Sequence, residues 1–188
     1  MKDYIYVLDD VLPITLCKAL IEKFERNEEH EQEKTVAPNR HFTEINISKH
    51  SHWQDQHDIM VNVVKGLTKV YMDRFCILTE SQWPKSFGYE QFRMKRYLPN
   101  GRDEFSFHTD VGSYASSRRF LSFLFYLNTV EDGGKTRFGY VPGGEPDLTV
   151  DAKEGRVLMF PPLWTHPHWG EKPVSGPKYI MSAYLHYL

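Results

Sequence analysis

The sequence contains little cysteine and no long apolar run. Only Cys17 and Cys76 occur among its 188 residues, too few for the disulfide framework of a small secreted scaffold. Cys17 falls within a helical pattern, where an isolated cysteine is typical of a small buried apolar side chain. We therefore expect a protein of a reducing compartment rather than a disulfide-stabilised extracellular one.

The apolar stretch near the start of the sequence is interrupted by Asp9 and Asp10. It is shorter than the roughly 20 residues that span a bilayer, and it lacks the uninterrupted apolar core of a signal peptide. These features predict a cytoplasmic protein without a membrane partner.

Neither sign of charge is in excess. The chain has 23 basic and 25 acidic residues, which gives a formal net charge of −2. Proteins that bind nucleic-acid backbones rely on clustered lysine and arginine, so this balance predicts no nucleic-acid partner. The length fits one all-β domain and no internal repeat is present, so residues 1–188 are expected to form a single domain. A monomer and a homodimer are both expected states.

Residues 1–86 have the pattern of a helix-rich N-terminal support, because apolar residues recur there at helical spacing. The predicted elements are a strand at 4–8, a helix after Pro13 with Leu16, Leu20, Ile21 and Phe24 on one face, a strand at 41–48, and a helix at 58–75 with Ile59, Val63, Leu67 and Val70 on one face. Residues 26–40 carry many charges and few apolar groups, which predicts a solvated loop.

Residues 87–188 are rich in short strand patterns. The predicted strands lie at 87–98, 104–110, 120–127, 135–138, 147–150, 156–160 and 178–188. Many short strands with few helices are typical of a double-sheet jelly roll. We therefore predict a mainly β fold with N-terminal helices, in which a double-stranded β-helix (jelly-roll) core over 87–188 carries the metal site and is flanked by α-helices.

The candidate metal site begins with His108-Thr109-Asp110 on the predicted strand at 104–110. Residues i and i+2 of a strand share a face and lie about 6.6 Å apart, so both side chains can reach one ion. A second histidine from a distant strand would complete the two-histidine, one-carboxylate arrangement that leaves positions open on non-heme Fe(II). His166 and His168, which follow the strand at 156–160, are the two candidates for that ligand.

Lys178 begins the last predicted strand, ten positions after His168. Two neutral imidazoles and one carboxylate leave a divalent ion with a net positive charge, which attracts an anionic chelating co-substrate. Lys178 could bind the far end of such a dicarboxylate. Strand alternation places this lysine on one face with Ile180, Ser182 and Tyr184.

The order and spacing of these motifs resemble the prolyl 4-hydroxylase branch of the Fe(II)/2-oxoglutarate dioxygenase superfamily, mainly over residues 88–188. In that family the distal histidine lies ten positions before the basic residue that binds 2-oxoglutarate, which selects His168 over His166. The matching segments are Arg96-Tyr97, Phe125-Tyr126-Leu127-Asn128, Gly133-Gly134-Lys135-Thr136-Arg137-Phe138, His168-Trp169-Gly170, Pro173-Val174 and Gly176-Pro177-Lys178.

The resemblance implies the residues and cofactors of the site. The catalytic metal ligands for Fe(II) would be His108, Asp110 and His168. The residues that bind 2-oxoglutarate would be Lys178, Tyr126 and Tyr97. O2 would be the second co-substrate, and ascorbate is a further candidate cofactor. The residues expected near the substrate are Tyr184, where the family often has tryptophan, Trp169 and Arg102.

The resemblance also implies the reaction, which is hydroxylation of an unactivated C–H bond with release of succinate and CO2. The substrate it favours is a prolyl residue in a peptide or protein, and the alternative is a free amino acid or a natural-product small molecule. In this family a loop in the N-terminal half can close over the substrate, and residues 26–40 are the candidate. Two other classes stay open: a cupin-like metal-binding protein without 2-oxoglutarate turnover, and a binding module that keeps the fold without catalysis.

Overall fold

The computed structural model describes residues 3–26, 31–77 and 81–188. The helices in these ranges are α1 (Ile14–Glu25), α2 (Gln54–Arg74) and three short 3-10 helices, η2 (Ile47–Lys49), η3 (Ser51–Trp53) and η4 (Tyr114–Ser116). The first strands are β1 (Tyr6–Leu8), β2 (Glu33–Ala37), β3 (Arg40–Asn46), β4 (Phe87–Tyr89), β5 (Arg93–Tyr97) and β6 (Glu104–His108). The later strands are β7 (Arg119–Tyr126), β8 (Thr136–Phe138), β9 (Leu148–Val150), β10 (Val157–Phe160), β11 (His168–Gly170) and β12 (Lys178–Tyr187).

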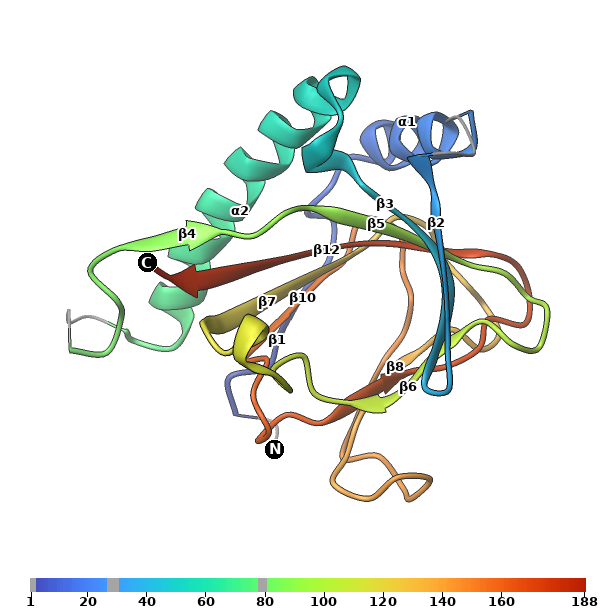
Figure 1. The fold of residues 1–188 in the computed structure, drawn as a ribbon. Coiled ribbons are helices and arrows are strands. Elements are labelled where there is room, and N and C mark those ends of the chain that lie inside the picture. Colours follow the sequence, from blue (N-terminus) through green and yellow to red (C-terminus); the bar gives the residue numbers. More distant parts are fainter. Residues whose placement is uncertain (1–2, 27–30, 78–80) are drawn as a thin grey trace.

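These strands pair antiparallel in one sheet that curls on itself (Figure 1). The strand order is β1-β10-β7-β12-β5-β3-β6-β11-β8-β9, with β2 added to β3 and β4 added to β12. The part from β1 to β3 forms one layer, and β6, β11, β8 and β9 form the facing layer. This arrangement confirms the predicted mainly β fold with a jelly-roll core and flanking helices.

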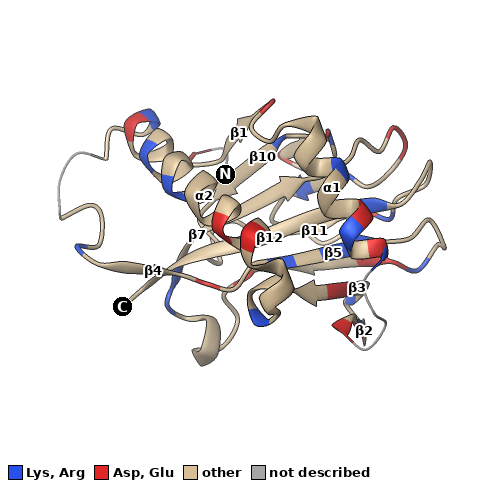
Figure 2. Cartoon of the chain, turned by 90° about the horizontal axis from the view of Figure 1, so that it is seen from above, with Lys and Arg blue, Asp and Glu red and all other residues tan. Residues whose placement is uncertain are grey.

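Both helices cover the outer face of the layer that contains β5 and β12 (Figure 1). The side chains that α1 buries are Cys17, Leu20 and Phe24, and those that α2 buries include Met60, Val64, Leu67 and Tyr71. Burying one large apolar side chain stabilises the fold by about 1.5–3 kcal/mol, so this outer core fixes the helices to the sheet. Charged residues of both signs lie mainly on the helices and loops around it (Figure 2). None of the helices described here is long and apolar enough to cross a membrane.

The predicted apolar face of the second helix is wrong in part. Ile59 is 43% exposed and Val70 is 41% exposed, whereas Met60 and Tyr71 are almost fully buried. The chain carries two overlapping apolar stripes with nearly the same helical period, and only packing on the sheet decides which one faces inward. Leu67 belongs to the buried one, so the predicted helix is right although its face is rotated by about one residue.

The loop predicted at 26–40 is also wrong for the described part of this segment, while residues 27–30 lie outside the described residues. β2 and β3 form an antiparallel hairpin in which Thr35 pairs with Phe42. β2 is an edge strand, so its outward side chains remain charged, as Glu33 and Lys34 are. A charged edge strand lacks the apolar alternation of a half-buried strand, which is why its sequence resembles a loop.

The inner face of the curled sheet forms a second core and the walls of a cavity. The residues of this inner core include Phe42, Tyr97, Tyr126, Phe138, Phe160 and Ile180. On β12, Lys178, Ile180, Ser182 and Tyr184 all line the inner cavity, as the strand alternation predicts. The inner core therefore closes one side of the space in which the polar residues of the site gather.

Candidate active site

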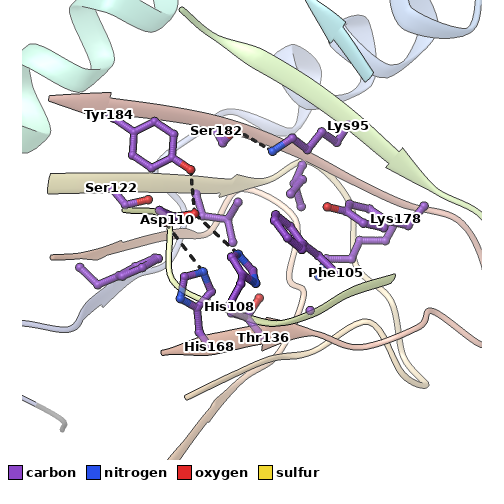
Figure 3. A pocket seen from close by; sticks show the side chains of 15 residues that line it. Lys95, Phe105, His108, Asp110, Ser122, Thr136, His168, Lys178, Ser182 and Tyr184 are labelled. Carbon is purple, nitrogen blue, oxygen red and sulfur yellow. Dashed lines mark hydrogen bonds and ion pairs between the residues drawn. The ribbon is translucent and has the colours of Figure 1, made fainter. Parts of the chain in front are cut away.

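Three potential metal ligands converge at the inner face of the sheet (Figure 3). His108, Asp110 and His168 each offer a ligand atom, and these atoms all lie within 4.8 Å of one another. The Nε2 atom of His108 is 3.6 Å from Oδ1 of Asp110, and Nε2 of His168 is 3.8 Å from Oδ2. Two imidazoles and one carboxylate at this spacing fit one divalent ion with open positions, as the sequence predicts.

Two neighbouring strands and a turn position these three residues. His168 on β11 pairs directly with His108 on β6, which brings residues 60 positions apart into adjacent strands. β11 was not predicted as a strand, because the prolines on its N-terminal side conceal a segment of only three residues. The predicted extension of β6 to Asp110 is wrong, since the strand ends at His108. Asp110 lies in the following turn, where the amide of Val111 donates to the carbonyl of Pro162 (3.1 Å).

Backbone carbonyls fix the orientation of both histidines. Nδ1 of His108 lies 2.7 Å from the carbonyl of Ser106, and Nδ1 of His168 lies 3.0 Å from the carbonyl of His166. A carbonyl only accepts a hydrogen bond, so each Nδ1 carries the proton and each Nε2 keeps its lone pair free toward Asp110. Burial, with a contribution from nearby His108, lowers the pKa of His168 to about 4, so this imidazole is neutral at physiological pH.

A tyrosine holds the carboxylate of Asp110, and an arginine holds its main chain. Burial alone would raise the pKa of Asp110, but the neighbouring His168 and His108 hold it well below its usual value, so the group is ionised. The hydroxyl of Tyr184 donates to Oδ1 of Asp110 at 3.0 Å, and the Arg119 guanidinium lies 4.1 Å from the Tyr184 ring centroid. Arg119 also donates to the Asp110 carbonyl at 3.1 Å. Tyr184, predicted near the substrate, therefore also orients the carboxylate.

We expect Tyr184→Phe to weaken Fe(II) binding about tenfold, because loss of a hydrogen bond that orients a ligand typically weakens metal affinity by 10- to 100-fold. Anaerobic titration with Fe(II) measures the change. Tyr187→Phe, at a residue that is 49% exposed, is the matched control and should bind as the wild type does. Equal affinity of Tyr184→Phe and wild type would show that the hydroxyl has no part in holding Asp110.

A cavity extends from the three ligands to Lys178, and Tyr97, Thr136 and Gly170 are among the residues that line it. Lys178 is only 3% exposed, and its ammonium has no hydrogen-bond or ion-pair partner among the residues that the structure describes. Its Nζ lies 5.7 Å from the Tyr97 ring centroid and 5.6 Å from that of Tyr126. A buried ammonium without an anion is unfavourable, so this end of the cavity fits the distal carboxylate of a dicarboxylic acid.

The two tyrosines predicted beside the co-substrate are placed differently. Tyr97 lines the cavity, whereas Tyr126 is fully buried behind it. The hydroxyl of Tyr126 donates to Oγ1 of Thr136 at 2.7 Å, and Thr136 does line the cavity. The structure thus puts Thr136 between Tyr126 and the space for a dicarboxylate. Thr136 lies within the predicted Gly-Gly-x-Thr-x-Phe segment, but was not singled out as a site residue.

Two of the residues predicted near the substrate, Trp169 and Arg102, do not line the cavity that holds Lys178 or the second cavity beside the metal ligands. Trp169 points to the opposite side of β11 from His168, and its ring centroid is 6.0 Å from that of Phe107. Arg102 is exposed in the turn between β5 and β6. A second cavity, the outer cavity, lies between the β2–β3 hairpin and the candidate metal ligands His108 and Asp110. Its polar lining includes Arg40, Glu44, Arg93, Lys95, Arg119 and Tyr184.

We expect the kcat/KM for 2-oxoglutarate to fall as pH rises above about 8. Burial lowers the pKa of Lys178 to about 8, so the charged form that binds a carboxylate is present below this pH and is lost above it. Because kcat/KM reports the free enzyme, the fall should approach about tenfold per pH unit. Lys178→Arg keeps its charge throughout, so its profile should stay flat. A wild-type profile that is flat to pH 10 would contradict this role of the lysine.

The fold and the site together define a non-heme Fe(II) oxygenase that uses 2-oxoglutarate. The chain belongs to the 2OG-Fe(II) oxygenase superfamily, whose family model matches residues 92–186, or 95 of the 188 residues. Fe(II) is accordingly its metal, and 2-oxoglutarate and O2 are its co-substrates. The converging ligands and the unpartnered Lys178 ammonium fit this pair of groups. The cupin-like alternative without 2-oxoglutarate turnover is set aside.

Several solved structures with the same fold are prolyl hydroxylases. A viral collagen prolyl hydroxylase from Paramecium Bursaria Chlorella virus-1, solved with 2-oxoglutarate, is 17% identical, with a TM-score of 0.65 over 99% of this chain and 97% of that one. A Pseudomonas putida prolyl-4-hydroxylase is 19% identical, with a TM-score of 0.66 over 98% and 92%. A Trichoplax adhaerens prolyl hydroxylase, solved with a hypoxia inducible factor peptide, is 15% identical, with a TM-score of 0.76 over 98% and 84%. The curated protein sequences contain no significant match.

Proposed function

We propose that the protein is a prolyl 4-hydroxylase-like enzyme that hydroxylates an unactivated C–H bond. The overall reaction converts the substrate R–H, 2-oxoglutarate and O2 to R–OH, succinate and CO2, with one oxygen atom entering the alcohol and the other entering succinate. The observation that carries the proposal is that His108, Asp110 and His168 open onto the same buried cavity as Lys178. Metal and co-substrate would therefore meet inside the curled sheet.

Each group in the site has a defined task. His108, Asp110 and His168 would hold Fe(II) through Nε2, a carboxylate oxygen and Nε2, and would leave the remaining positions for co-substrate and O2. Bound Fe(II) and 2-oxoglutarate supply the oxidising chemistry, which the protein directs. Lys178 would bind the distal carboxylate of 2-oxoglutarate through a charge-assisted hydrogen bond, and Thr136 would offer a hydroxyl beside it.

Aromatic side chains keep the ligands in place and exclude water. The ring of Phe105 stacks on His108 with centroids 3.5 Å apart and an interplanar angle of 6°. Phe138 and Phe160 lie against His168 at 5.5 and 4.8 Å. These contacts restrict rotation of both imidazoles and give the centre an apolar surround, in which charge interactions are stronger than in water.

Two substrate classes have support. A prolyl residue in a peptide or protein is supported by the prolyl hydroxylases that share the fold, one of them solved with a peptide. A free amino acid or another small molecule is the second candidate, and the observation that favours it is a buried lysine, Lys95, between the two cavities. The predicted single domain, cytoplasmic location, monomeric or homodimeric state and use of ascorbate stay predictions.

Product analysis tests this proposal. The Fe(II)-reconstituted protein would be incubated with 2-oxoglutarate, O2 and either a proline-containing peptide with blocked termini or the free L-amino acids. We expect one of these compounds to gain the mass of one oxygen atom, with one equivalent of succinate formed for each. The matched control is Asp110→Asn, which should give neither product. A wild-type product that loses two hydrogens without gaining oxygen would contradict hydroxylation.

A further inference from the structure

A second buried lysine faces the site from β5. Lys95 is only 9% exposed, and it lies on the same face of its strand as Tyr97. The nearest partner of its ammonium is the hydroxyl of Ser182, at 3.4 Å, which is a long hydrogen bond (Figure 3). Within the described residues its Nζ forms no ion pair. Lys95 lines both the inner and the outer cavity, so its side chain lies where the two cavities meet.

Two partly buried arginines beside the outer cavity already have carboxylate partners. Arg119 forms a two-pronged contact with Glu90, at 2.9 and 2.8 Å. Arg93 lies 3.5 Å from the carboxylate of Glu44. Glu44 is the residue of β3 that pairs with Lys95 across the sheet. Lys95 contacts a neutral hydroxyl and a ring, with its Nζ 5.3 Å from the centroid of Phe42, and the carboxylates of Glu44 and Asp110 act on it only from beyond ion-pair distance. Such contacts compensate part of the unfavourable burial of an ammonium, but not as fully as an anion does.

The ammonium groups of Lys95 and Lys178 have different neighbours, since Lys95 reaches Ser182 whereas Lys178 lies by the rings of Tyr97 and Tyr126. Lys178 on β12 pairs with Tyr97 on β5, and Lys95 on β5 pairs with Ile180 on β12. The two pairs are therefore neighbours on the inner face, two residues apart along each strand. From strand spacing the two lysines lie roughly 8 Å apart at their Cα atoms. Lys178 lines only the inner cavity, whereas Lys95 also reaches the outer one. When 2-oxoglutarate occupies Lys178, the Lys95 ammonium remains available to a second anion.

We propose that Lys95 binds a carboxylate of the primary substrate, so that the enzyme acts on a free amino acid or a similar small carboxylic acid rather than on an internal residue of a peptide. This inference rests on the proposed function and selects its substrate class. Arg40, which is exposed beside the outer cavity and has no partner in the described ranges, adds positive charge along the path of entry. An internal peptide residue would present a neutral amide and leave the Lys95 ammonium without an anion at ion-pair distance.

The test compares each L-amino acid with its carboxamide and with an N- and C-terminally blocked proline peptide, and it reads succinate formation from 2-oxoglutarate. We expect at least one free acid to stimulate turnover and its carboxamide to be about 100-fold less effective, because a buried charge built to meet a carboxylate discriminates strongly against a neutral analogue. In Lys95→Met the KM for that acid should rise about 100-fold while the KM for 2-oxoglutarate stays unchanged. Lys178→Met should show the opposite pattern.

Several outcomes would overturn the inference. One is turnover of a blocked peptide or a carboxamide at the same rate as the free acid. Another is an unchanged substrate KM in Lys95→Met. The third is a 2-oxoglutarate KM that rises as much in Lys95→Met as in Lys178→Met. If no amino acid stimulates turnover, acetate and acetamide serve as minimal probes with the protein saturated in Mn(II) and 2-oxoglutarate. Lack of Lys95-dependent thermal stabilisation by acetate would then overturn it.

Folding and co-substrate binding are checked separately. Lys95→Met removes a buried charge without an anion and replaces it with an apolar chain of similar length, so we expect this variant to melt no lower than wild type. Stabilisation of the wild type by 2-oxoglutarate and its loss in Lys178→Met report on the proposed function alone. If the protein does not bind 2-oxoglutarate, the proposed function is wrong. If it binds 2-oxoglutarate but binds no carboxylate at Lys95, only this inference is wrong.

Discussion

Replacing His168 with alanine is expected to abolish 2-oxoglutarate turnover, with a loss on the order of a thousandfold or more, because removal of one of three ligands deprives the reaction of its metal. His166→Ala should keep most of the activity. The Nε2 atom of His166 lies 3.0 Å from the carbonyl of Asp3, and its Nδ1 lies 2.9 Å from the hydroxyl of Thr165, so both ring nitrogens face away from the metal ligands. Bound Fe(II) per protein and succinate formation are the two measurements.

The two histidines form a matched pair for this comparison. His166 is 7% exposed and His168 is 6% exposed, so both substitutions remove a buried imidazole from neighbouring positions. Thermal melting of the apo proteins shows whether either variant is misfolded. Either histidine could be the distal ligand by residue type and place in the sequence. Loss of Fe(II) binding in His166→Ala with retention in His168→Ala would therefore reverse the ligand assignment.

Lys178→Met is expected to weaken 2-oxoglutarate binding about 100-fold. Truncating one partner of a buried, charge-assisted contact typically costs about 2–4 kcal/mol, and each 1.4 kcal/mol is a factor of ten in affinity. The contact is made equally before and during the reaction, so kcat at saturating 2-oxoglutarate should change much less than KM. Anaerobic titration of the Mn(II)-loaded protein with 2-oxoglutarate measures the affinity directly.

Lys172→Met provides the control for this change. Its side chain is 44% exposed and lies 3.8 Å from Glu104 at the surface, where an ion pair contributes at most about 1 kcal/mol. Its affinity for 2-oxoglutarate should match that of the wild type. If Lys178→Met bound 2-oxoglutarate as tightly as Lys172→Met does, the buried ammonium would not be the anchor of the co-substrate.

The three candidate metal ligands could be predicted from sequence because their positions depend on spacing. His108 and Asp110 are two residues apart, so their side chains can reach one ion whether the chain continues as a strand or turns. The wrong end predicted for β6 therefore did not change the predicted ligands. The choice between His166 and His168 needed the ten-residue offset to Lys178 that the family resemblance supplied. The jelly roll was predictable because many short strand patterns with few helices fill the C-terminal half.

The features that the sequence did not reveal depend on tertiary contacts. Tyr184 meets Asp110 across 74 positions of sequence, and Thr136 meets Tyr126 across the inner face of the sheet. Lys95 has the pattern of an ordinary strand lysine, and only pairing of β5 with both β3 and β12 buries it. The outward direction of Trp169 depends on β11, a strand too short to have a period of its own.

The most direct test is succinate formation by the wild-type protein, reconstituted with Fe(II) without oxygen, loaded with 2-oxoglutarate and then exposed to O2. We expect 2-oxoglutarate to bind before oxygen is admitted and succinate to appear afterwards, faster when the substrate is present. A protein that holds Fe(II) but neither binds 2-oxoglutarate nor forms succinate would contradict the assignment of Lys178 and the cavity to this co-substrate.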